Sequence, residues 1–191
     1  MVYAKNVITN SILKKRRKMK ALNNPWLNIP GYNCFGCAPH NPIGLKMKFF
    51  LEGDNVMSIF PLQNNYQGWI DTLHGGIMAT LLDEICAWQL IHLLGTSGVT
   101  SQMTVKYKKT VSTKWSHIVL RSEVIERKRN IVIMQATITS PTGEVCAMAE
   151  CTYFSFRQDK AEEMGFKRTE TFGPELTLEE AIASTINPVS E

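Results

Sequence analysis

The 191-residue sequence lacks a long uninterrupted apolar run. A bilayer-spanning helix needs about 20 apolar residues, which no segment approaches. The N-terminal residues also lack the apolar run of about 7 to 15 residues found in secretory signals. Cysteine is scarce: the sequence has five scattered cysteines, an odd number. They do not resemble a disulfide framework. We therefore predict no membrane segment and expect a cytoplasmic protein.

Acidic residues are missing from one short basic run, and that run accounts for the formal net charge of +4. The run contributes six positive charges, from Lys14, Lys15, Arg16, Arg17, Lys18 and Lys20. Removing these six from the 21 Lys and Arg leaves fifteen bases against 17 acids, a net charge of about −2. This balance argues against a protein that coats nucleic acid. We interpret the run as a charged, solubilising helix face, with a nucleic-acid or lipid contact as the alternative.

No internal repeat is present, and the apolar content of 44% suits one domain with a single core. We predict a basic N-terminal arm at residues 1–30, a domain at 31–156 and a charged tail at 157–191. Within the tail, Thr177 to Glu180 has the spacing of a capping box, which predicts that a short helix begins there.

Alternating apolar residues predict a strand at 45–52, whose core face is formed by Leu45, Met47, Phe49 and Leu51. A second strand is predicted at 56–60. Four further runs have strand character and are separated by turn-like segments; they lie at 99–108, 116–126, 130–139 and 144–156. Between the two groups, residues 76–94 form the only long helical candidate, which is apolar on nearly every side and should be enclosed. The order predicts an α+β fold in which a largely antiparallel, curved sheet wraps around a central helix.

The loop that enters this helix carries the sequence His74-Gly75-Gly76. Backbone N–H groups point outward at a helix N-terminus, which carries about half a positive charge. Such a terminus can polarise a carbonyl group or hold an oxyanion. The alternative is a tight entry turn with a hydrogen-bonded histidine.

Two carboxylates, Asp83 and Glu84, lie in the middle of this apolar helix. Burying a carboxylate costs several kcal/mol unless it is paired, so one of them should face a site. An aspartate there could act as a general base or nucleophile, or it could instead hold a loop backbone. Gly75 and Asp83 are eight residues apart, or about 12 Å along a helix. If both are catalytic, they must act from different subunits of a homodimer.

The predicted element order, together with Leu73 to Asp83, resembles the hotdog-fold thioesterases of the PaaI-like, phenylacetate-degradation type. The resemblance covers roughly residues 30–156. Cys34-Phe35-Gly36-Cys37, followed by Asn41 to Leu45, is similar to the lead-in found in a subgroup of that family.

The resemblance implies hydrolysis of an acyl-CoA thioester at a dimer interface. We expect no cofactor, metal ion, nucleic acid or membrane to take part. The predicted assembly is a homodimer or a tetramer. Asp83 corresponds to the general base or nucleophile, and Gly75 to the oxyanion-hole donor. Thr100, or else Ser101, corresponds to the residue that positions water or the carboxylate, and His74 braces the loop.

Other residues are candidates for substrate binding, namely Gly76, Glu84, Ser101, Trp69 and Gly68. Gly68 stands where some family members have an asparagine that contributes to the site. That role is therefore missing here, or it passes to Gln67, Asn65 or Asn64.

Three alternatives remain open. Cys34, Cys37 and His40 could belong to a zinc site, but a structural zinc site has four ligands. Cys146 and Cys151 would lie about 17 Å apart on opposite faces of a strand, so they cannot complete it. A packed cysteine pair in a turn is the preferred interpretation. The functional alternatives are a hotdog dehydratase or hydratase and a non-catalytic acyl-CoA sensor.

Overall fold

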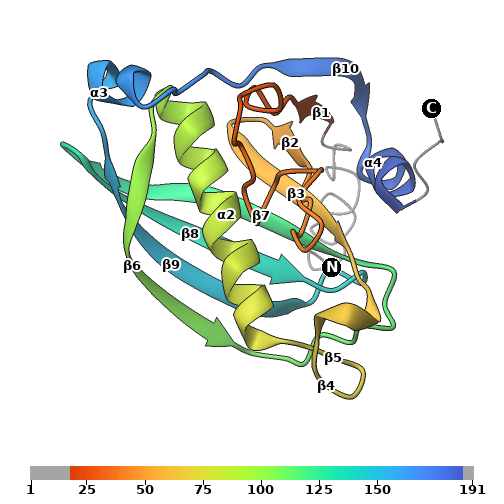
Figure 1. Cartoon of the computed structure of the whole chain (residues 1–191). Helices are drawn as coiled ribbons and strands as arrows, with labels where there is room; N and C mark the ends of the chain where they lie inside the picture. The colour runs from red at the N-terminus through yellow and green to blue at the C-terminus, as the bar shows by residue number, and fades with distance from the viewer. Residues whose placement is uncertain (1–17, 187–191) are drawn as a thin grey trace, which may run out of the picture.

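The computed structural model describes residues 18–186 (Figure 1). Its main feature is an eight-stranded antiparallel sheet in the order β10-β1-β2-β3-β7-β8-β9-β6. These strands are β1 (Met19–Leu22), β2 (Phe49–Glu52), β3 (Asn55–Pro61), β6 (Gly98–Tyr107), β7 (His117–Lys128), β8 (Ile131–Thr139), β9 (Val145–Ser155) and β10 (Thr171–Leu176). Most of the basic run, Lys14 to Arg17, lies outside the described residues.

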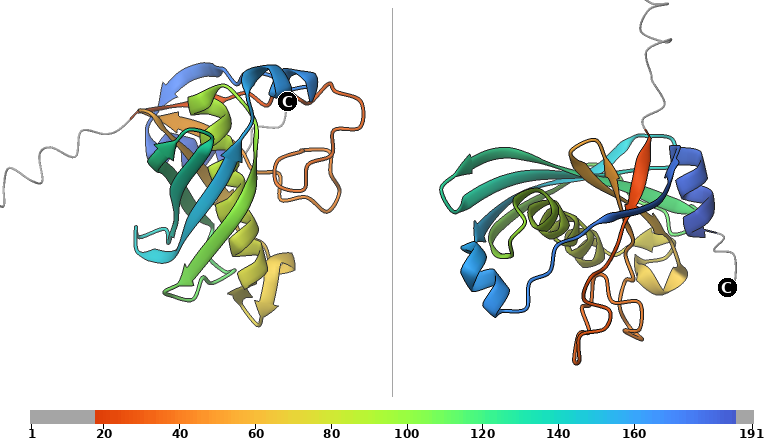
Figure 2. Two further views of the ribbon diagram at one scale, coloured as in Figure 1. Left: turned by 90° about the vertical axis from the view of Figure 1, so that its left-hand side faces the viewer. Right: turned by 90° about the horizontal axis from the view of Figure 1, so that it is seen from above.

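The sheet curves around one long helix, α2 (Gly75–Leu94), which contacts β3, β6, β7, β8 and β9 (Figures 1 and 2). By length and composition alone this helix could cross a membrane. In this fold it is the core helix, with Leu81, Leu82 and Ile85 fully buried against the sheet. Its second half is enclosed from another side, since Trp88 stacks on Phe49 at a ring-centroid distance of 4.1 Å. These contacts explain a helix that is apolar on nearly every side and confirm the predicted α+β arrangement.

The six predicted strands are present, but the first is shorter than predicted. β2 begins at Phe49, whereas Leu45 and Met47 are buried outside any strand. Their N–H groups donate to the carbonyl oxygens of Phe35 and Gly36. These bonds take the place of a strand ladder.

The alternation predicted for residues 45–52 is also wrong at its end, because Phe50 and Glu52 are buried. A second, smaller core covers the outer face of β2 and β3; it contains Met19, Phe50, Met57, Ile59, Val119 and Ala181. The Glu52 carboxylate accepts a hydrogen bond from Arg121 Nε at 3.2 Å.

The second core is built by segments that the sequence analysis assigned to the arm and the tail. β1 and β10 extend the sheet beyond β2, and α4 (Leu178–Ile186) packs over β3. The predicted capping box at α4 is confirmed: Thr177 N–H donates to Glu180 Oε2 at 2.7 Å, and Glu180 N–H donates to Thr177 Oγ1 at 3.3 Å. A further short helix, α3 (Gln158–Glu163), follows β9.

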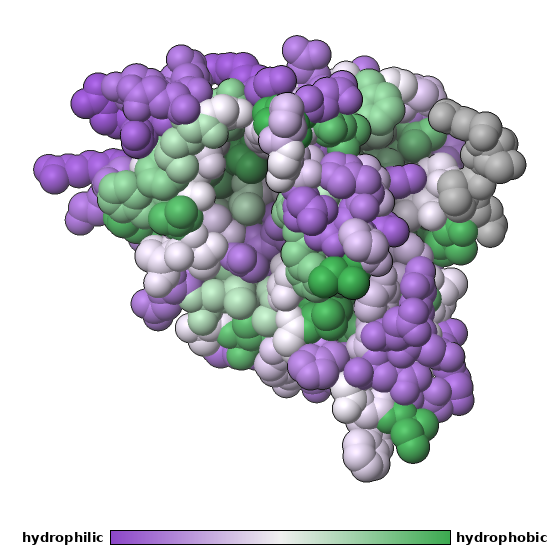
Figure 3. Space-filling view, in the orientation of Figure 1, coloured by the Kyte–Doolittle hydropathy of each residue, from purple (hydrophilic) through white to green (hydrophobic). Residues whose placement is uncertain are grey.

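Strand β6 lies at the other end of the sheet, and its outer edge pairs with no strand within residues 18–186. Most of its ten residues are exposed, and Val99 and Tyr107 each leave about half of their surface in solvent. Apolar surface is visible over β6 and the neighbouring end of α2 (Figure 3). Long, unpaired edges of this kind are ready to pair with another strand.

Candidate active site

The N-terminus of α2 is capped by His74, whose Nδ1 accepts the Gly76 N–H at 2.8 Å. A side chain at Gly76 would crowd this bond, since a Cβ there would lie 3.0 Å from Nδ1. The Gly76 N–H is therefore engaged within the loop. By contrast, the Gly75 N–H donates to no group of residues 18–186, while the Gly75 carbonyl accepts from Tyr107 Oη at 2.9 Å. One N–H of the helix terminus thus remains available for a carbonyl oxygen.

Two cavities flank this terminus. One, of about 350 Å³, is lined by Thr72, Leu73, Gly75, Met78, Tyr107 and residues 108–111. The other, of about 480 Å³, is lined by Asn65, Tyr66, Gln67, His74, Gly76, Ile77 and Thr80. The helix terminus therefore faces space on both sides.

Two predicted substrate-binding residues lie in the short hairpin beside this terminus, which consists of β4 (Gln67–Trp69) and β5 (Thr72–Leu73). Gly68 packs on the loop, since a Cβ there would lie 3.0 Å from His74 Cα. Trp69 projects from the hairpin with 75% of its surface exposed. In the single chain neither residue contacts Gly75 or Asp83 through a hydrogen bond or ring contact.

Asp83 lies on the side of α2 that faces β6 and β9. Its Oδ1 accepts a hydrogen bond from Thr100 Oγ1 at 2.7 Å and lies 2.6 Å from Tyr153 Oη. The Tyr153 hydroxyl also lies 2.7 Å from the Asp83 main-chain oxygen. Oδ2 makes no hydrogen bond to the described residues. The carboxylate is thus held through one oxygen while the other remains free to receive a proton.

Tyr153 is the site residue that the sequence analysis missed. Burial and, to a smaller extent, the negative charge of Asp83 raise the pKa of Tyr153 far above its ordinary value, so its hydroxyl stays protonated and can only donate to the carboxylate. Its position in the alternation of β9 could have revealed it, because Tyr153 follows the small inward-facing residues Ala147, Ala149 and Cys151 on the same buried face. A buried tyrosine hydroxyl needs a polar partner.

Of the two hydroxyl residues considered at the start of β6, the structure brings Thr100 to Asp83. Ser101 is the extra residue of a bulge between Thr100 and Gln102. Its hydroxyl donates to the Thr152 carbonyl oxygen at 3.0 Å, away from the carboxylate.

Glu84 is next to Asp83 in sequence but points to a different side of α2. Its Oε1 accepts from Trp88 Nε1 at 3.2 Å and lies 3.5 Å from Cys34 Sγ. Glu84, which was predicted to bind substrate, thus lies beneath the loop that contains Cys34 and makes no hydrogen bond to Asp83. Adjacent residues of a helix point about 100° apart, which separates the two carboxylates.

The comparisons with known proteins agree with this fold. Residues 71–147, which include Gly75, Asp83 and Thr100, match the family model described as the thioesterase superfamily. No curated protein matches the chain.

Solved structures match over a somewhat larger part of the chain. A thioesterase superfamily protein has 21% identity and a TM-score of 0.58 over 63% of this chain. The matched part spans 59% of the length of that protein. A hypothetical thioesterase from Streptococcus pneumoniae, solved with coenzyme A, has 27% identity and a TM-score of 0.51, over 55% of this chain and 80% of its own. A Haemophilus influenzae thioesterase has 19% identity and a TM-score of 0.55, over 60% of this chain and 80% of its own. The chain thus has the predicted hotdog fold, and its solved neighbours are thioesterase-superfamily proteins.

Proposed function

We propose that the protein hydrolyses acyl-CoA thioesters, as a member of the PaaI-like group, in the cytoplasm. The observation that carries this proposal is the Asp83 carboxylate, which two hydroxyl groups hold by Oδ1 on the open side of α2. The match to the thioesterase superfamily over residues 71–147 supports it. So does the 27% identical S. pneumoniae protein, whose structure contains coenzyme A. In further structures of that protein, one aspartate and one threonine were each replaced by alanine.

In the proposed reaction, Asp83 Oδ2 takes a proton from a water molecule as the water oxygen attacks the thioester carbonyl carbon. The carbonyl oxygen becomes an oxyanion, which the Gly75 N–H stabilises at the positive end of α2. When the oxyanion collapses, the bond from carbon to sulfur breaks and the thiolate of CoA takes up the proton. Thr100 and Tyr153 position the carboxylate throughout. Direct attack by Asp83 on the carbonyl is the variant of this mechanism in which water enters at the second step.

The two groups must come from different subunits. Along α2, Gly75 and Asp83 are about 12 Å apart, which is too far for one carbonyl group to reach both. The unpaired edge of β6 lies beside Asp83, and a second β6 could pair with it across a twofold axis. Such a dimer would bring two α2 helices side by side and complete two sites.

The proposal is tested with a panel of acyl-CoA substrates by following the release of free thiol. We expect Asp83→Asn to lower kcat by at least about 100-fold, which is the scale of a lost general base. Asp54→Asn changes an exposed carboxylate in the turn after β2 and serves as the matched control. Hydrolysis by Asp83→Asn at the wild-type rate would remove the proposal, whereas coenzyme A binding without any hydrolysis in the wild type would indicate a binding protein.

A further inference from the structure

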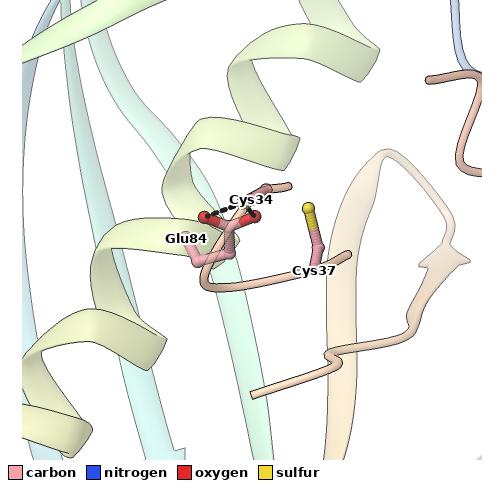
Figure 4. Close-up of side chains that lie close together, drawn as sticks. All are labelled: Cys34, Cys37 and Glu84. Carbon is pink, nitrogen blue, oxygen red and sulfur yellow. Dashed lines mark hydrogen bonds between the residues drawn. The ribbon is translucent and has the colours of Figure 1, made fainter. Parts of the chain in front are cut away.

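A cluster of three metal-ligating groups lies on a side of α2 away from Asp83. Cys34 Sγ, Cys37 Sγ and a carboxylate oxygen of Glu84 all lie within 4.8 Å of one another (Figure 4). The carboxylate comes from the middle of α2, and the two thiols come from the loop that crosses it. Cys34 Sγ lies 3.5 Å and 3.8 Å from the two carboxylate oxygens of Glu84.

The loop that carries the cysteines is fixed in place by its backbone. Ala38 N–H donates to the Cys34 carbonyl oxygen at 3.1 Å, which closes the turn between the two thiols. Within this turn, the Phe35 and Gly36 carbonyls accept from the N–H groups of Leu45 and Met47. Gly36 packs directly on Glu84, where a Cβ would collide with the carboxyl group. The three side chains are therefore brought together by a specific fold of the loop.

The charges in this cluster are unbalanced. Glu84 is partly buried and forms no ion pair with a basic side chain of residues 18–186; its carboxylate instead accepts from the indole N–H of Trp88 and the thiol of Cys34. The nearest further side chain is neutral and not cationic, since the Tyr32 hydroxyl lies 3.0 Å from Cys37 Sγ. Desolvated carboxylates are stabilised by a positive charge, and no side chain in this cluster supplies one.

We propose that Cys34, Cys37 and Glu84 bind a zinc ion. Zinc binds thiolate at about 2.3 Å and carboxylate oxygen at about 2.1 Å, so tetrahedral ligation places sulfur and oxygen about 3.6 Å apart. The distances from Cys34 to Glu84 already match this separation. On binding, both thiols release their protons to solvent, and water occupies the fourth position. Trp88 Nε1 stays on Oε1 and orients the carboxylate, as outer hydrogen bonds do for metal ligands.

The ligand set differs from the one that the sequence spacing suggests. His40 follows the two cysteines at a plausible interval, but its Nε2 lies 2.6 Å from the Tyr32 main-chain oxygen and outside the cluster. The third ligand instead comes from α2, 47 residues after Cys37. A zinc ion here would tie the loop to the helix that carries Asp83, and the site is separate from the proposed hydrolytic reaction.

The test uses the full chain, stripped with a chelator and then titrated with zinc, with bound metal counted by mass spectrometry. We expect one zinc per chain in the wild type. Cys34→Ser, Cys37→Ser and Glu84→Ala should each weaken binding by about 100-fold or more, beyond the effect of losing an outer hydrogen bond. His40→Ala is the matched control and should bind zinc as the wild type does. Loss of zinc from His40→Ala, or full retention by Cys34→Ser and Cys37→Ser, would overturn the proposal.

A second measurement on the wild type does not depend on the variants folding. Cobalt in place of zinc should give the intense absorption of thiolate-to-metal charge transfer together with the visible bands of tetrahedral cobalt. Zinc should also protect two thiols per chain from a thiol reagent. A folded chain that binds neither metal, or cobalt bound without thiolate absorption, rejects the site.

Discussion

Replacing Gly75 with proline should remove the oxyanion donor and leave the helix intact. Gly75 is the first residue of α2 after the cap at His74, which is the position where a helix accepts proline most readily. His74 has φ −62° and ψ 131°, the extended conformation that a residue before proline requires. The Gly75 N–H donates to no described group, so its removal breaks no bond of the fold.

The expected loss follows from the role proposed for that N–H. Removing one oxyanion donor costs about 2.7 to 4 kcal/mol, or about 100- to 1,000-fold in kcat. Gly75→Ala is the control: it retains the N–H, and its Cβ would meet the Tyr107 hydroxyl at 3.5 Å, an ordinary contact. We expect hydrolysis by Gly75→Ala to stay within about tenfold of the wild type, because the donor is preserved.

The same variant tests whether the site is shared between subunits. Two differently tagged chains, one with Gly75→Pro and one with Asp83→Asn, would be co-expressed and purified through both tags. A mixed dimer would contain one site with both groups intact and one site with neither. We therefore expect about half of the wild-type activity per dimer, although each parent dimer is nearly inactive. A mixed dimer as inactive as its parents would refute the shared site. So would a wild type that light scattering shows to be monomeric and that is nevertheless fully active.

Three further predictions concern the groups around the helix. Tyr153→Phe should lower the free energy of unfolding by about 1.5 to 3 kcal/mol in urea denaturation, because a buried hydrogen bond to a charged group is lost, and should lower kcat rather than raise KM. Burial lowers the pKa of His92 and of His117 below the unfolded value of about 6.5, so the folded chain binds fewer protons than the unfolded chain. The free energy of unfolding should therefore fall as the pH drops from about 7 to 5.5. A variant with both His92→Gln and His117→Gln should show a shallower fall. Thr177→Ala should lower stability by about 1 kcal/mol through loss of the α4 cap.

Much of the central fold could be predicted because its signals are local. Strands β8 and β9 alternate between buried and less buried residues, and turn-like segments separate the strand-like runs after α2. The helix was recognisable from its length and from its apolar residues on nearly every side. The capping box at Thr177 and Glu180 depends on four consecutive residues, so its two hydrogen bonds could also be anticipated.

The segments that could not be predicted depend on distant contacts. β1 and β10 are short, and they pair with each other although about 150 residues separate them in sequence. The alternating pattern of residues 45–52 placed Phe50 on the face opposite to Phe49, which was expected to be exposed. Nothing in that pattern indicates that α4 covers the outer face of β2 and β3. Tyr153 comes 70 positions after its partner Asp83 in the sequence. No pattern within a single element encodes such a contact.

The two adjacent carboxylates of α2 illustrate how one helix can serve two purposes. The sequence indicated that Asp83 and Glu84 were both too polar for their surroundings, and each has its own polar partners in the structure. Hydroxyl groups from β6 and β9 hold Asp83, whereas an indole and a thiol hold Glu84. Because the helix is rigid, whatever fixes Glu84 against the Cys34 loop also fixes the depth at which Asp83 meets Thr100 and Tyr153. A metal ion bound at Glu84 would therefore help to position Asp83 without touching the substrate.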